Sequence, residues 1–291
     1  MKLAFFILKL LGKLPHSALR ALARLLGWLC YWLVAPRRKV GQTNLALCFP
    51  EKSQAERDRI LRQHFYHMAL LVLEYGKYWY APAAELRQMV HYQDKHILDD
   101  ALAAGEKVIL LYPHFTAFEA AVYALNQDVP LISVYSHQKN AALDAQILHG
   151  RHRYNNVFLV GRTEGLRSII KHIRSEAAPF LYLPDQDFGA KDSLFIDFFG
   201  VQAATIAGLP RIAQMTHAKI IPAIPTRQAD GTVLLRFYPA WENYPSADLA
   251  ADVRRMNAFI EERVREHIPQ YYWLHKRFKT RPAGEPSFYA K

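Results

Sequence analysis

Cysteine is almost missing from this chain of 291 residues, which contains only Cys30 and Cys48. Two cysteines provide neither a disulfide framework nor the spacing of a zinc site, and they indicate a reducing, cytosolic setting. The Gly-x-Ser-x-Gly, Gly-x-x-x-x-Gly-Lys and Gly-x-Gly-x-x-Gly motifs are also missing. Their absence argues against a hydrolase nucleophile elbow, a nucleotide-triphosphate loop and a dinucleotide site.

Acidic residues are scarce relative to basic ones. The chain contains 26 Asp and Glu residues but 37 Lys and Arg residues, so the formal net charge is +11. This excess predicts anionic partners, such as a phosphorylated lipid, a membrane surface, an acidic protein or nucleic acid. Because 51% of the residues are hydrophobic, the chain can bury a large core, and its length suits one large domain with appendages.

The N-terminal region lacks an apolar run long enough to span a bilayer. Its longest uninterrupted run, Leu25 to Ala35, is shorter than the roughly 20 residues that a spanning helix needs. Basic residues recur four apart on one helix face, and the other faces are apolar; these residues are Lys9, Lys13, Arg20 and Arg24. The pattern is typical of a helix lying on a membrane surface. We therefore expect residues 1–39 to form a membrane-associated helical anchor, followed by a globular part, residues 40–291.

Two other interpretations of the anchor stay open. A span is compatible with the sequence if the Arg24 side chain reaches towards the interface. Alternatively, the segment is a buried amphipathic helical hairpin, although the basic flanks and the pair Trp28 and Trp32 favour an interface.

The rest of the chain alternates short apolar runs with helical patterns. The runs KVILLYP, PLISVYS, NNVFLV and PFLYLPD read as strands, and AFEAAVYAL, AALDAQILH and TEGLRSIIKHIRSE read as helices between them. This alternation predicts an α/β fold with a mixed, largely parallel central sheet flanked by helices. Ser53 and Glu56 have capping-box spacing before a long helix. A hairpin is expected around Asp230 and Gly231, followed by a helix from about Asp248 to Glu266.

The segment YPHFTAFEAAVY places His114 at the end of a predicted strand and Glu119 five residues later. Thr116 and Glu119 have capping-box spacing for a helix that begins near Thr116, which is a purely structural explanation. The other interpretation is chemical: a neutral His114, folded back over the first turn and oriented by Glu119, would deprotonate an alcohol. The local pattern does not decide between the two.

Other polar residues have weaker signals. Asp185 and Asp187 follow a strand, where Asp-x-Asp can hold a divalent ion but more often stabilises a turn. Arg151 is a lone basic residue whose usual explanation is a solvated face. Near the C-terminus, aromatic residues alternate with cations suited to nucleic acid, phosphorylated lipid or a membrane interface, namely Lys276, Arg277, Lys279 and Arg281. The N-terminal pattern favours lipid.

Five segments in this order resemble the late acyltransferases of lipid A biosynthesis, the lauroyl/myristoyl transferase family: RRKVGQTNLALCFPEKSQAERDRI, PHFTAFE, GRTEGLRSIIKHI, LPDQDFG and WLHKRFKTRP. The resemblance runs from Leu3 to Tyr289. It identifies residues 40–291 as an acyltransferase domain and assigns the family's His-x4-acidic element to His114 and Glu119. It also implies that Arg151 and Asp185 position or stabilise the reacting groups, with Asp187 as a competitor for Asp185.

The resemblance implies an enzyme on the cytoplasmic face of the bacterial inner membrane. It would move an acyl chain from acyl carrier protein to a hydroxyl on a hydroxyacyl chain of a phosphorylated, Kdo-bearing lipid A precursor. Direct transfer with His114 as base, oriented by Glu119, needs no metal and no cofactor, and no nucleic acid is expected as a partner.

Three other functions stay open. The first is acyl transfer to another glycolipid or to glycerol phosphate. The second is metal-dependent glycosyl transfer through Asp185 and Asp187. The third is non-enzymatic binding of anionic lipid or nucleic acid by the C-terminal tail.

Overall fold

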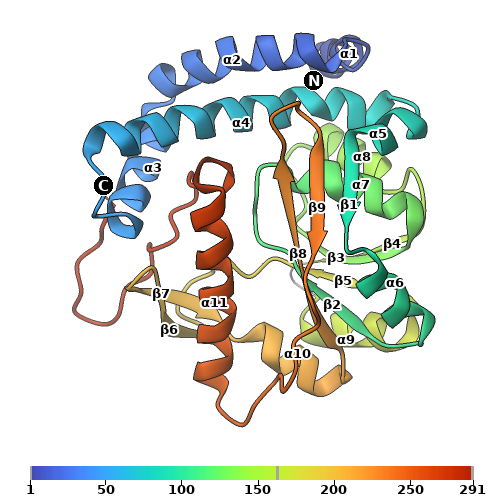
Figure 1. The fold of residues 1–291 in the computed structure, drawn as a ribbon, viewed down its shortest axis with the longest axis vertical. Helices are drawn as coiled ribbons and strands as arrows, with labels where there is room; N and C mark the ends of the chain where they lie inside the picture. The colour runs from blue at the N-terminus through green and yellow to red at the C-terminus, as the bar shows by residue number, and fades with distance from the viewer. Residues whose placement is uncertain (1, 162–163, 290–291) are drawn as a thin grey trace.

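A central sheet organises the computed structural model, which describes residues 2–161 and 164–289 (Figure 1). Its seven strands lie in the order β1-β9-β8-β2-β5-β3-β4. They are β1 (Val90–Gln93), β2 (Val108–Leu111), β3 (Leu131–Tyr135), β4 (Val157–Gly161), β5 (Phe180–Tyr182), β8 (Lys219–Arg227) and β9 (Val233–Phe237). Neighbouring strands are parallel except β8 and β9, which form the antiparallel hairpin predicted around Asp230 and Gly231. The predicted mixed, largely parallel sheet is thus confirmed.

Helices cover both faces of this sheet, and β2 shows how the core is divided between them. Val108 and Leu110 join one apolar cluster, and Ile109 and Leu111 join the other, because alternate side chains of a strand point to opposite faces. The first cluster contains residues of α5 (Ala83–Met89), α6 (His96–Ala103) and α7 (Phe118–Asp128), with α8 (Ala141–Arg151) packed against it. The second contains residues of α9 (Leu166–Ser175), α10 (Gly208–Thr216) and α11 (Leu249–Glu266). Burial on both faces explains why the strands read as continuous apolar runs.

Two helices begin where the sequence predicts, and each has a side-chain cap. At the start of α4 (Gln54–Tyr80), the Ser53 hydroxyl accepts a hydrogen bond from the Glu56 amide, and the Glu56 carboxylate accepts one from the Ser53 amide. This reciprocal pair is the predicted capping box. At the start of α11, the Asp248 carboxylate accepts hydrogen bonds from Ala250 and Ala251 at 2.9 and 3.0 Å.

Some elements were not predicted. A separate antiparallel pair, β6 (Ser193–Phe198) and β7 (Val201–Ile206), lies beside α11, and a short 3₁₀ helix, η1 (Ile268–Gln270), follows that helix. The helical pattern predicted from Thr163 corresponds to α9, which begins at Leu166; Thr163 itself lies outside the described residues.

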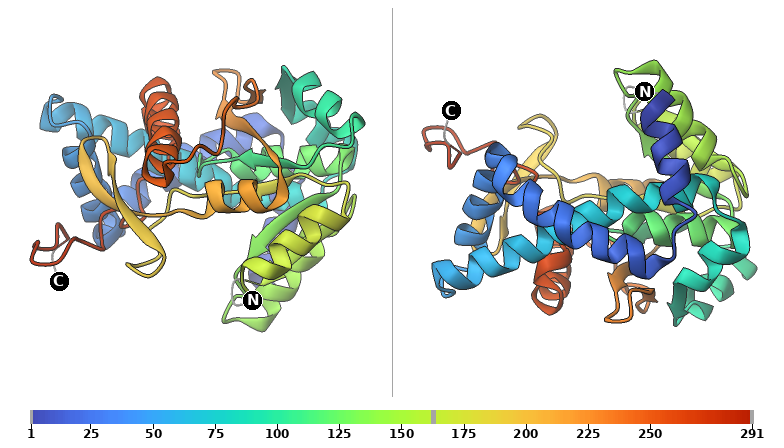
Figure 2. Two further views of the ribbon diagram at one scale, coloured as in Figure 1. Left: turned by 90° about the horizontal axis from the view of Figure 1, so that it is seen from below. Right: turned by 90° about the horizontal axis from the view of Figure 1, so that it is seen from above.

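Three helices begin the chain: α1 (Lys2–Leu11), α2 (His16–Leu33) and α3 (Ala35–Cys48). Figure 2 (right) shows α1 and α2 laid over α4. The crossing of α1 and α4 is very close, since a Cβ added at Gly12 would lie 2.3 Å from the Gly76 carbonyl oxygen. Within residues 2–161 and 164–289, no single helix has the length and apolar composition to cross a bilayer. Helices α2 and α3 meet the criterion only as a pair, and they are bent by 90°.

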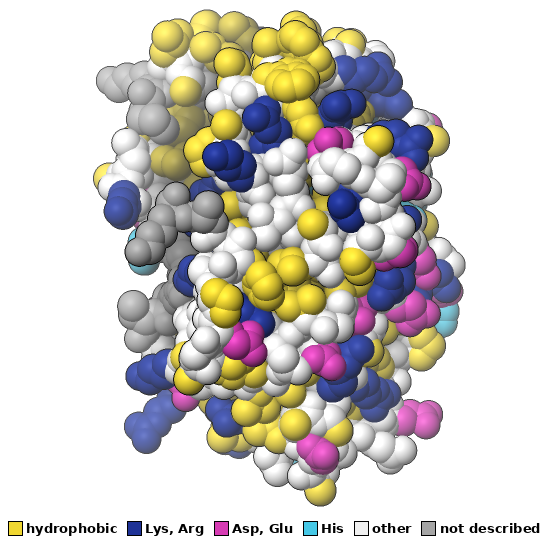
Figure 3. All heavy atoms as spheres, turned by 90° about the vertical axis from the view of Figure 1, so that its left-hand side faces the viewer, with side chains coloured by type: hydrophobic (Ala, Val, Ile, Leu, Met, Phe, Trp, Pro, Cys, Tyr) yellow, Lys and Arg dark blue, Asp and Glu magenta, His cyan; other side chains and the backbone are white. Residues whose placement is uncertain are grey.

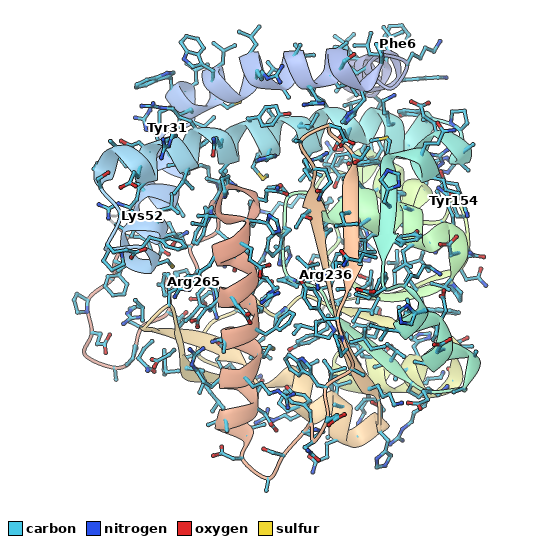
Figure 4. The ribbon with its side chains drawn as sticks, in the orientation of Figure 1. Phe6, Tyr31, Lys52, Tyr154, Arg236 and Arg265 are labelled. Atoms are coloured by element: carbon cyan, nitrogen blue, oxygen red, sulfur yellow. The ribbon has the colours of Figure 1, made fainter. Side chains whose placement is uncertain are left out.

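The two faces of α2 differ in what they contact. Its buried residues are Leu19, Ala23, Gly27 and Tyr31. The outward surface of α1, α2 and the turn between them exposes large apolar side chains, namely Leu3, Phe6, Ile7, Leu10, Leu14, Leu25, Trp28, Trp32 and Leu33. Figure 3 shows apolar side chains gathered at this end of the molecule, with Lys and Arg beneath them, and Figure 4 shows Phe6 on the outer helix layer and Tyr31 beside α4. The segment is therefore half buried rather than a fully buried hairpin. The boundary predicted between residues 39 and 40 falls within α3 and stays a prediction.

Candidate active site

His114 and Asp185 meet at one edge of the sheet because their strands are parallel neighbours. Strand β2 pairs with β5 so that Leu111 lies opposite Tyr182, and each polar residue follows three positions later. Ligand-binding groups gather beyond the carboxyl ends of such strands. Asp185 accepts two hydrogen bonds from His114, at 2.9 Å from the backbone N–H and at 2.7 Å between Oδ1 and Nδ1.

This geometry fixes the tautomer of His114. A carboxylate only accepts hydrogen bonds, so Nδ1 carries the proton and, in the neutral ring, Nε2 is left with a free lone pair. Burial by itself would raise the pKa of the Asp185 carboxyl, but the charge and hydrogen bonds of His114 outweigh it and hold this pKa below its ordinary value. Asp185 is thus ionised at neutral pH, and it orients the ring so that Nε2 is the nitrogen available to a substrate proton.

The loop that carries His114 is held by the last residue of η1 and the chain segment after it. The His114 carbonyl accepts a hydrogen bond from the Tyr272 amide at 2.9 Å, and the Thr116 amide donates to the Gln270 carbonyl at 2.8 Å. Between them, Phe115 forms an antiparallel bridge with Tyr271. Such backbone pairing restricts the position of the imidazole, as catalysis requires.

The structure corrects both interpretations of Glu119. Helix α7 begins at Phe118, with Ala117 as N-cap and no side-chain hydrogen bond at the cap, so the Thr116–Glu119 capping box is wrong. The predicted orientation of His114 by Glu119 is also wrong, because the neighbouring strand supplies Asp185 instead. Glu119 lies in the first turn of α7 and accepts a hydrogen bond from Arg151 at 2.5 Å.

Arg151 stands at the end of α8 and does not lie on a solvated face. Its side chain is 17% exposed, and that of its partner Glu119 is 3% exposed. Burial by itself would lower the pKa of the guanidinium, but the Glu119 charge outweighs burial and raises it. The buried ion pair therefore joins the first turn of α7 to the last turn of α8. A catalytic role for either residue stays a prediction.

A cleft of about 830 Å³ opens beside His114. Its walls are mostly apolar, and the apolar lining includes Val134, Leu166, Ile169, Phe180, Leu183, Ile206 and Ile212. Lys191 and Arg211 also line it. This size lies within the usual range for ligand sites, and the lining suits an alkyl chain that ends in a polar group beside His114.

Asp185 and Asp187 do not converge. Asp187 accepts hydrogen bonds from Thr280, at 2.7 Å from its amide and 2.8 Å from its hydroxyl, and from the Gly189 amide at 2.9 Å. It thus tethers the C-terminal segment, while Asp185 binds His114. In the part of the chain that the structure describes, no group of three or more His, Cys, Asp or Glu residues is arranged to hold a metal ion. The paired metal site considered for Asp-x-Asp is therefore not formed by these two side chains.

The C-terminal cations divide into two groups. Arg277 is 4% exposed and donates hydrogen bonds to a carbonyl and a hydroxyl of β7, both at 2.7 Å. Arg281 donates to another β7 carbonyl and pairs with Glu285. The contacts predicted from these two arginines to an anionic substrate or membrane are therefore corrected, because their guanidinium groups bind the protein itself. Lys276 and Lys279 are exposed, and their predicted contacts stay predictions.

Comparison with known proteins gives one consistent result. The family described as "Bacterial lipid A biosynthesis acyltransferase" matches residues 2–280. The chain is 31% identical to the lipid A biosynthesis lauroyltransferase of Escherichia coli (strain K12), over 97% of this chain and 92% of that protein. It is 30% identical to the palmitoleoyltransferase of the same strain, with the same coverage. It is also 30% identical to the strain's myristoyltransferase, over 85% of this chain and 77% of that protein. These three names specify three different acyl chains.

Proposed function

The chain belongs to the bacterial lipid A biosynthesis acyltransferases, and from this premise we propose that acyl carrier protein is its donor. The proposed acceptor is a hydroxyl on a hydroxyacyl chain of a Kdo-bearing lipid A precursor. The observation that carries the proposal is the His114–Asp185 pair beside the apolar cleft. A base next to an alkyl-binding surface is the arrangement that acyl transfer to a lipid hydroxyl requires.

The reaction proceeds by direct transfer. Nε2 of His114 takes the proton from the lipid hydroxyl as the oxygen attacks the thioester carbonyl carbon. The tetrahedral intermediate then expels the carrier thiolate, which receives the proton from His114, so that one C–O bond forms and one C–S bond breaks. Asp185, bonded to Nδ1–H at 2.7 Å, stabilises the imidazolium that forms between the two proton transfers.

Glu119 and Arg151 act as positioning residues in this proposal. Their buried ion pair holds the first turn of α7, and His114 lies four residues before that helix begins. Displacement of α7 would change the angle of approach between the hydroxyl and the imidazole, and such errors are costly in rate.

Residues 1–39 provide the membrane contact. The exposed apolar side chains of α1 and α2, Trp28 and Trp32 among them, suit the interfacial layer of a bilayer, and residues 40–291 form the acyltransferase domain. We place the enzyme on the cytoplasmic side of the bacterial inner membrane, where acyl carrier protein is found. The net charge of +11 is complementary to an acidic carrier and to a phosphorylated acceptor.

A transfer assay with the purified full chain tests the function. The donors are acyl carrier protein loaded with an acyl chain and coenzyme A loaded with the same chain. The acceptors are a Kdo-bearing lipid A precursor, the same lipid without Kdo, and glycerol phosphate. We expect product only with the lipid A precursors and fastest with the carrier-bound chain, and none with His114→Ala. Product with glycerol phosphate alone, or full activity of His114→Ala, would overturn the assignment. Mass spectrometry of lipid A from cells lacking the protein then identifies the chain length and its position.

A further inference from the structure

A second cavity, of about 280 Å³, lies between α2, α4 and the turn of the β8–β9 hairpin. It shares no lining residue with the cleft beside His114. Its lining includes three arginines and one histidine: Arg20, Arg24, Arg227 and His67. We refer to it as the arginine pocket.

Two buried nitrogen atoms of the arginine pocket have no hydrogen-bond partner among the described residues: Nε of Arg227 and Nδ1 of His67. The Arg227 side chain is 3% exposed, and its two Nη atoms bind Glu74, which leaves Nε free to donate. Burial, followed by the charge of Arg227, lowers the pKa of His67 to about 3, so its ring is neutral. Buried polar atoms are almost always satisfied in folded proteins. The unpaired Nε–H of Arg227 and the unpaired ring nitrogen of His67, on two side chains that line one cavity, therefore indicate a ligand with polar atoms.

The other two arginines are more accessible. Arg20 donates a hydrogen bond to the Ala229 carbonyl at 2.9 Å and another to the Asp230 carbonyl, which fixes the hairpin turn against α2. Gly231 fits there because its φ is +100° and an added Cβ would lie 2.9 Å from Arg20. Arg24 is exposed and has no ion-pair or hydrogen-bond partner within the described part of the chain.

Local acidic groups compensate Arg227 and part of the charge of Arg20, but not Arg24. Glu74 is bound by Arg227 and by His16, at 2.8 Å from Nε2 of the latter. The Asp230 carboxylate accepts hydrogen bonds from the Thr232 amide and hydroxyl, at 2.9 and 2.7 Å. Arg24 is thus left as an unpaired charge beside the unsatisfied Nε–H of Arg227. A small anion with several oxygens would complement both, and His67 would donate to it as the tautomer with the proton on Nδ1.

We propose that the arginine pocket binds the phosphate group of a membrane lipid. The pocket lies directly beneath α2, whose outward face exposes Leu25, Trp28 and Trp32. An apolar face buried at the boundary of head groups and acyl chains brings the pocket to the depth of the lipid phosphates.

The pocket and His114 lie beyond the same edge of the sheet. Leu111 of β2 lies opposite Pro222 of β8, and β8 continues for five more residues to Arg227. At roughly 3.3 Å per residue this places Arg227 about 16 Å further along the strand direction. In this proposal a single phosphorylated lipid spans a separation of this order, with its head group in the pocket and another part of it at the active site. The identification of this lipid as the acceptor rests on the proposed function. The pocket itself does not.

Vesicle flotation with the full chain, without acyl donor or acceptor, tests the pocket. The vesicles are made from digalactosyldiacylglycerol, a neutral lipid without phosphate. They carry equal charge from phosphatidic acid, phosphatidylglycerol or cholesteryl hemisuccinate, whose carboxylate supplies charge without phosphate. The variants are Arg24→Gln and, as a charge-matched control, Lys13→Gln, an exposed cation in the turn between α1 and α2. We expect Arg24→Gln to bind phosphate-containing vesicles about tenfold more weakly, because it loses a charge-assisted hydrogen bond, and Lys13→Gln to lose far less.

Equal weakening by both variants, or equal binding to hemisuccinate vesicles, would overturn the proposal in favour of unspecific attraction. A second measurement, the KM of the acceptor in neutral detergent, identifies the source of the phosphate. If Arg24→Gln raises KM and leaves kcat unchanged, the pocket binds the acceptor; if it changes only flotation, the pocket binds bulk phospholipid. If the wild type is inactive in the transfer assay while Arg24→Gln still floats more weakly than the wild type, that result supports the pocket and contradicts only the proposed function.

Discussion

Asp185 binds His114 at two points, with one carboxylate oxygen on the backbone N–H and the other on Nδ1 of the ring. Backbone and side chain are thus positioned by the same residue. We expect Asp185→Asn to lower kcat by about 10²- to 10⁴-fold, since the amide no longer stabilises an imidazolium. Because the substitution leaves the cleft intact, KM should change little. Steady-state kinetics with a carrier-bound acyl donor measure both constants.

Asp187→Asn is the matched control for this prediction. It removes an acidic side chain two residues away, whose partners are Thr280 and Gly189 rather than His114. We expect a lower melting temperature and a kcat close to that of the wild type. A fall in kcat for Asp187→Asn but not for Asp185→Asn would show that the wrong carboxylate has been assigned.

The relationship of His114 to Asp185 was within reach of the sequence, but it was not predicted. Both residues were recognised as following strands, and neighbouring parallel strands bring such residues together. What was missing is strand order: β5 is the third strand after β2 along the chain, yet it lies directly beside β2. The sequence pattern inside YPHFTAFE offered a nearer carboxylate, Glu119, and local spacing does not reveal a partner supplied by another strand.

The elements that sequence predicted well are those determined by local chemistry. The Ser53 capping box, the hairpin turn at Asp230 and the helix start at Asp248 each depend on hydrogen bonds within a few residues. The β6–β7 pair was missed because its outward side chains are only partly buried and its sequence, SLFIDFFGVQAATI, alternates poorly. The burial of Arg151 was missed because it depends on the packing of α8 against α7, which no local signal specifies.

The Glu119–Arg151 pair predicts a loss of stability. Glu119→Gln leaves a partly buried guanidinium without its counter-charge. Because Arg151 keeps some contact with solvent, we expect a cost below the roughly 3–5 kcal/mol of a fully buried pair. Urea unfolding followed by circular dichroism measures this cost. The double substitution Glu119→Gln with Arg151→Met removes both charges, and we expect it to recover part of the lost stability.

Turnover per folded molecule shows whether Glu119 and Arg151 position the active site or take part in the reaction. A positioning role predicts that the double variant keeps measurable turnover, because His114 and Asp185 remain. Wild-type stability of Glu119→Gln combined with complete loss of turnover would instead show that Glu119 contacts the reacting atoms.

The close crossing of α1 and α4 predicts that Gly76→Ala destabilises the N-terminus. In the interior of a helix, alanine is normally more favourable than glycine by about 1 kcal/mol. Here, however, an added Cβ would lie 2.1 Å from the Leu8 carbonyl oxygen, so the helices must separate. We expect faster amide hydrogen exchange in α1, measured by mass spectrometry. Ser17→Ala, on the exposed surface of α2, should leave exchange in α1 unchanged.

The ionisation of Glu74 makes the free energy of unfolding depend on pH. Burial would raise the pKa of this carboxyl, but Arg227 and the hydrogen bonds from His16, Arg227 and Tyr78 lower it to about 2, from an ordinary value of 4.5. Because the pKa of the folded state is depressed, the stabilisation is complete above pH 4.5 and is lost as pH falls towards 2.

The difference between wild type and Glu74→Gln isolates this contribution. Urea unfolding is measured from about pH 6 to pH 3 for both proteins. We expect the variant to be less stable at the upper end, where Arg227 has lost its partner, and the gap between the two proteins to narrow as the pH falls. A gap that widens on acidification would contradict the assigned direction of the pKa shift.

The buried ion pair of Glu74 and Arg227 also connects the outer helices to His114. Glu74 of α4 binds Arg227, whose backbone is bonded to the Gln270 side chain at 2.7 and 3.0 Å, and Gln270 holds the Thr116 amide beside His114. Each link is a short, buried contact with little freedom to stretch. If α1 and α2 rest on the bilayer as proposed, the height of the imidazole above the membrane plane is set by this framework. The enzyme would then select which hydroxyl to acylate partly by how far that hydroxyl stands out of the lipid layer.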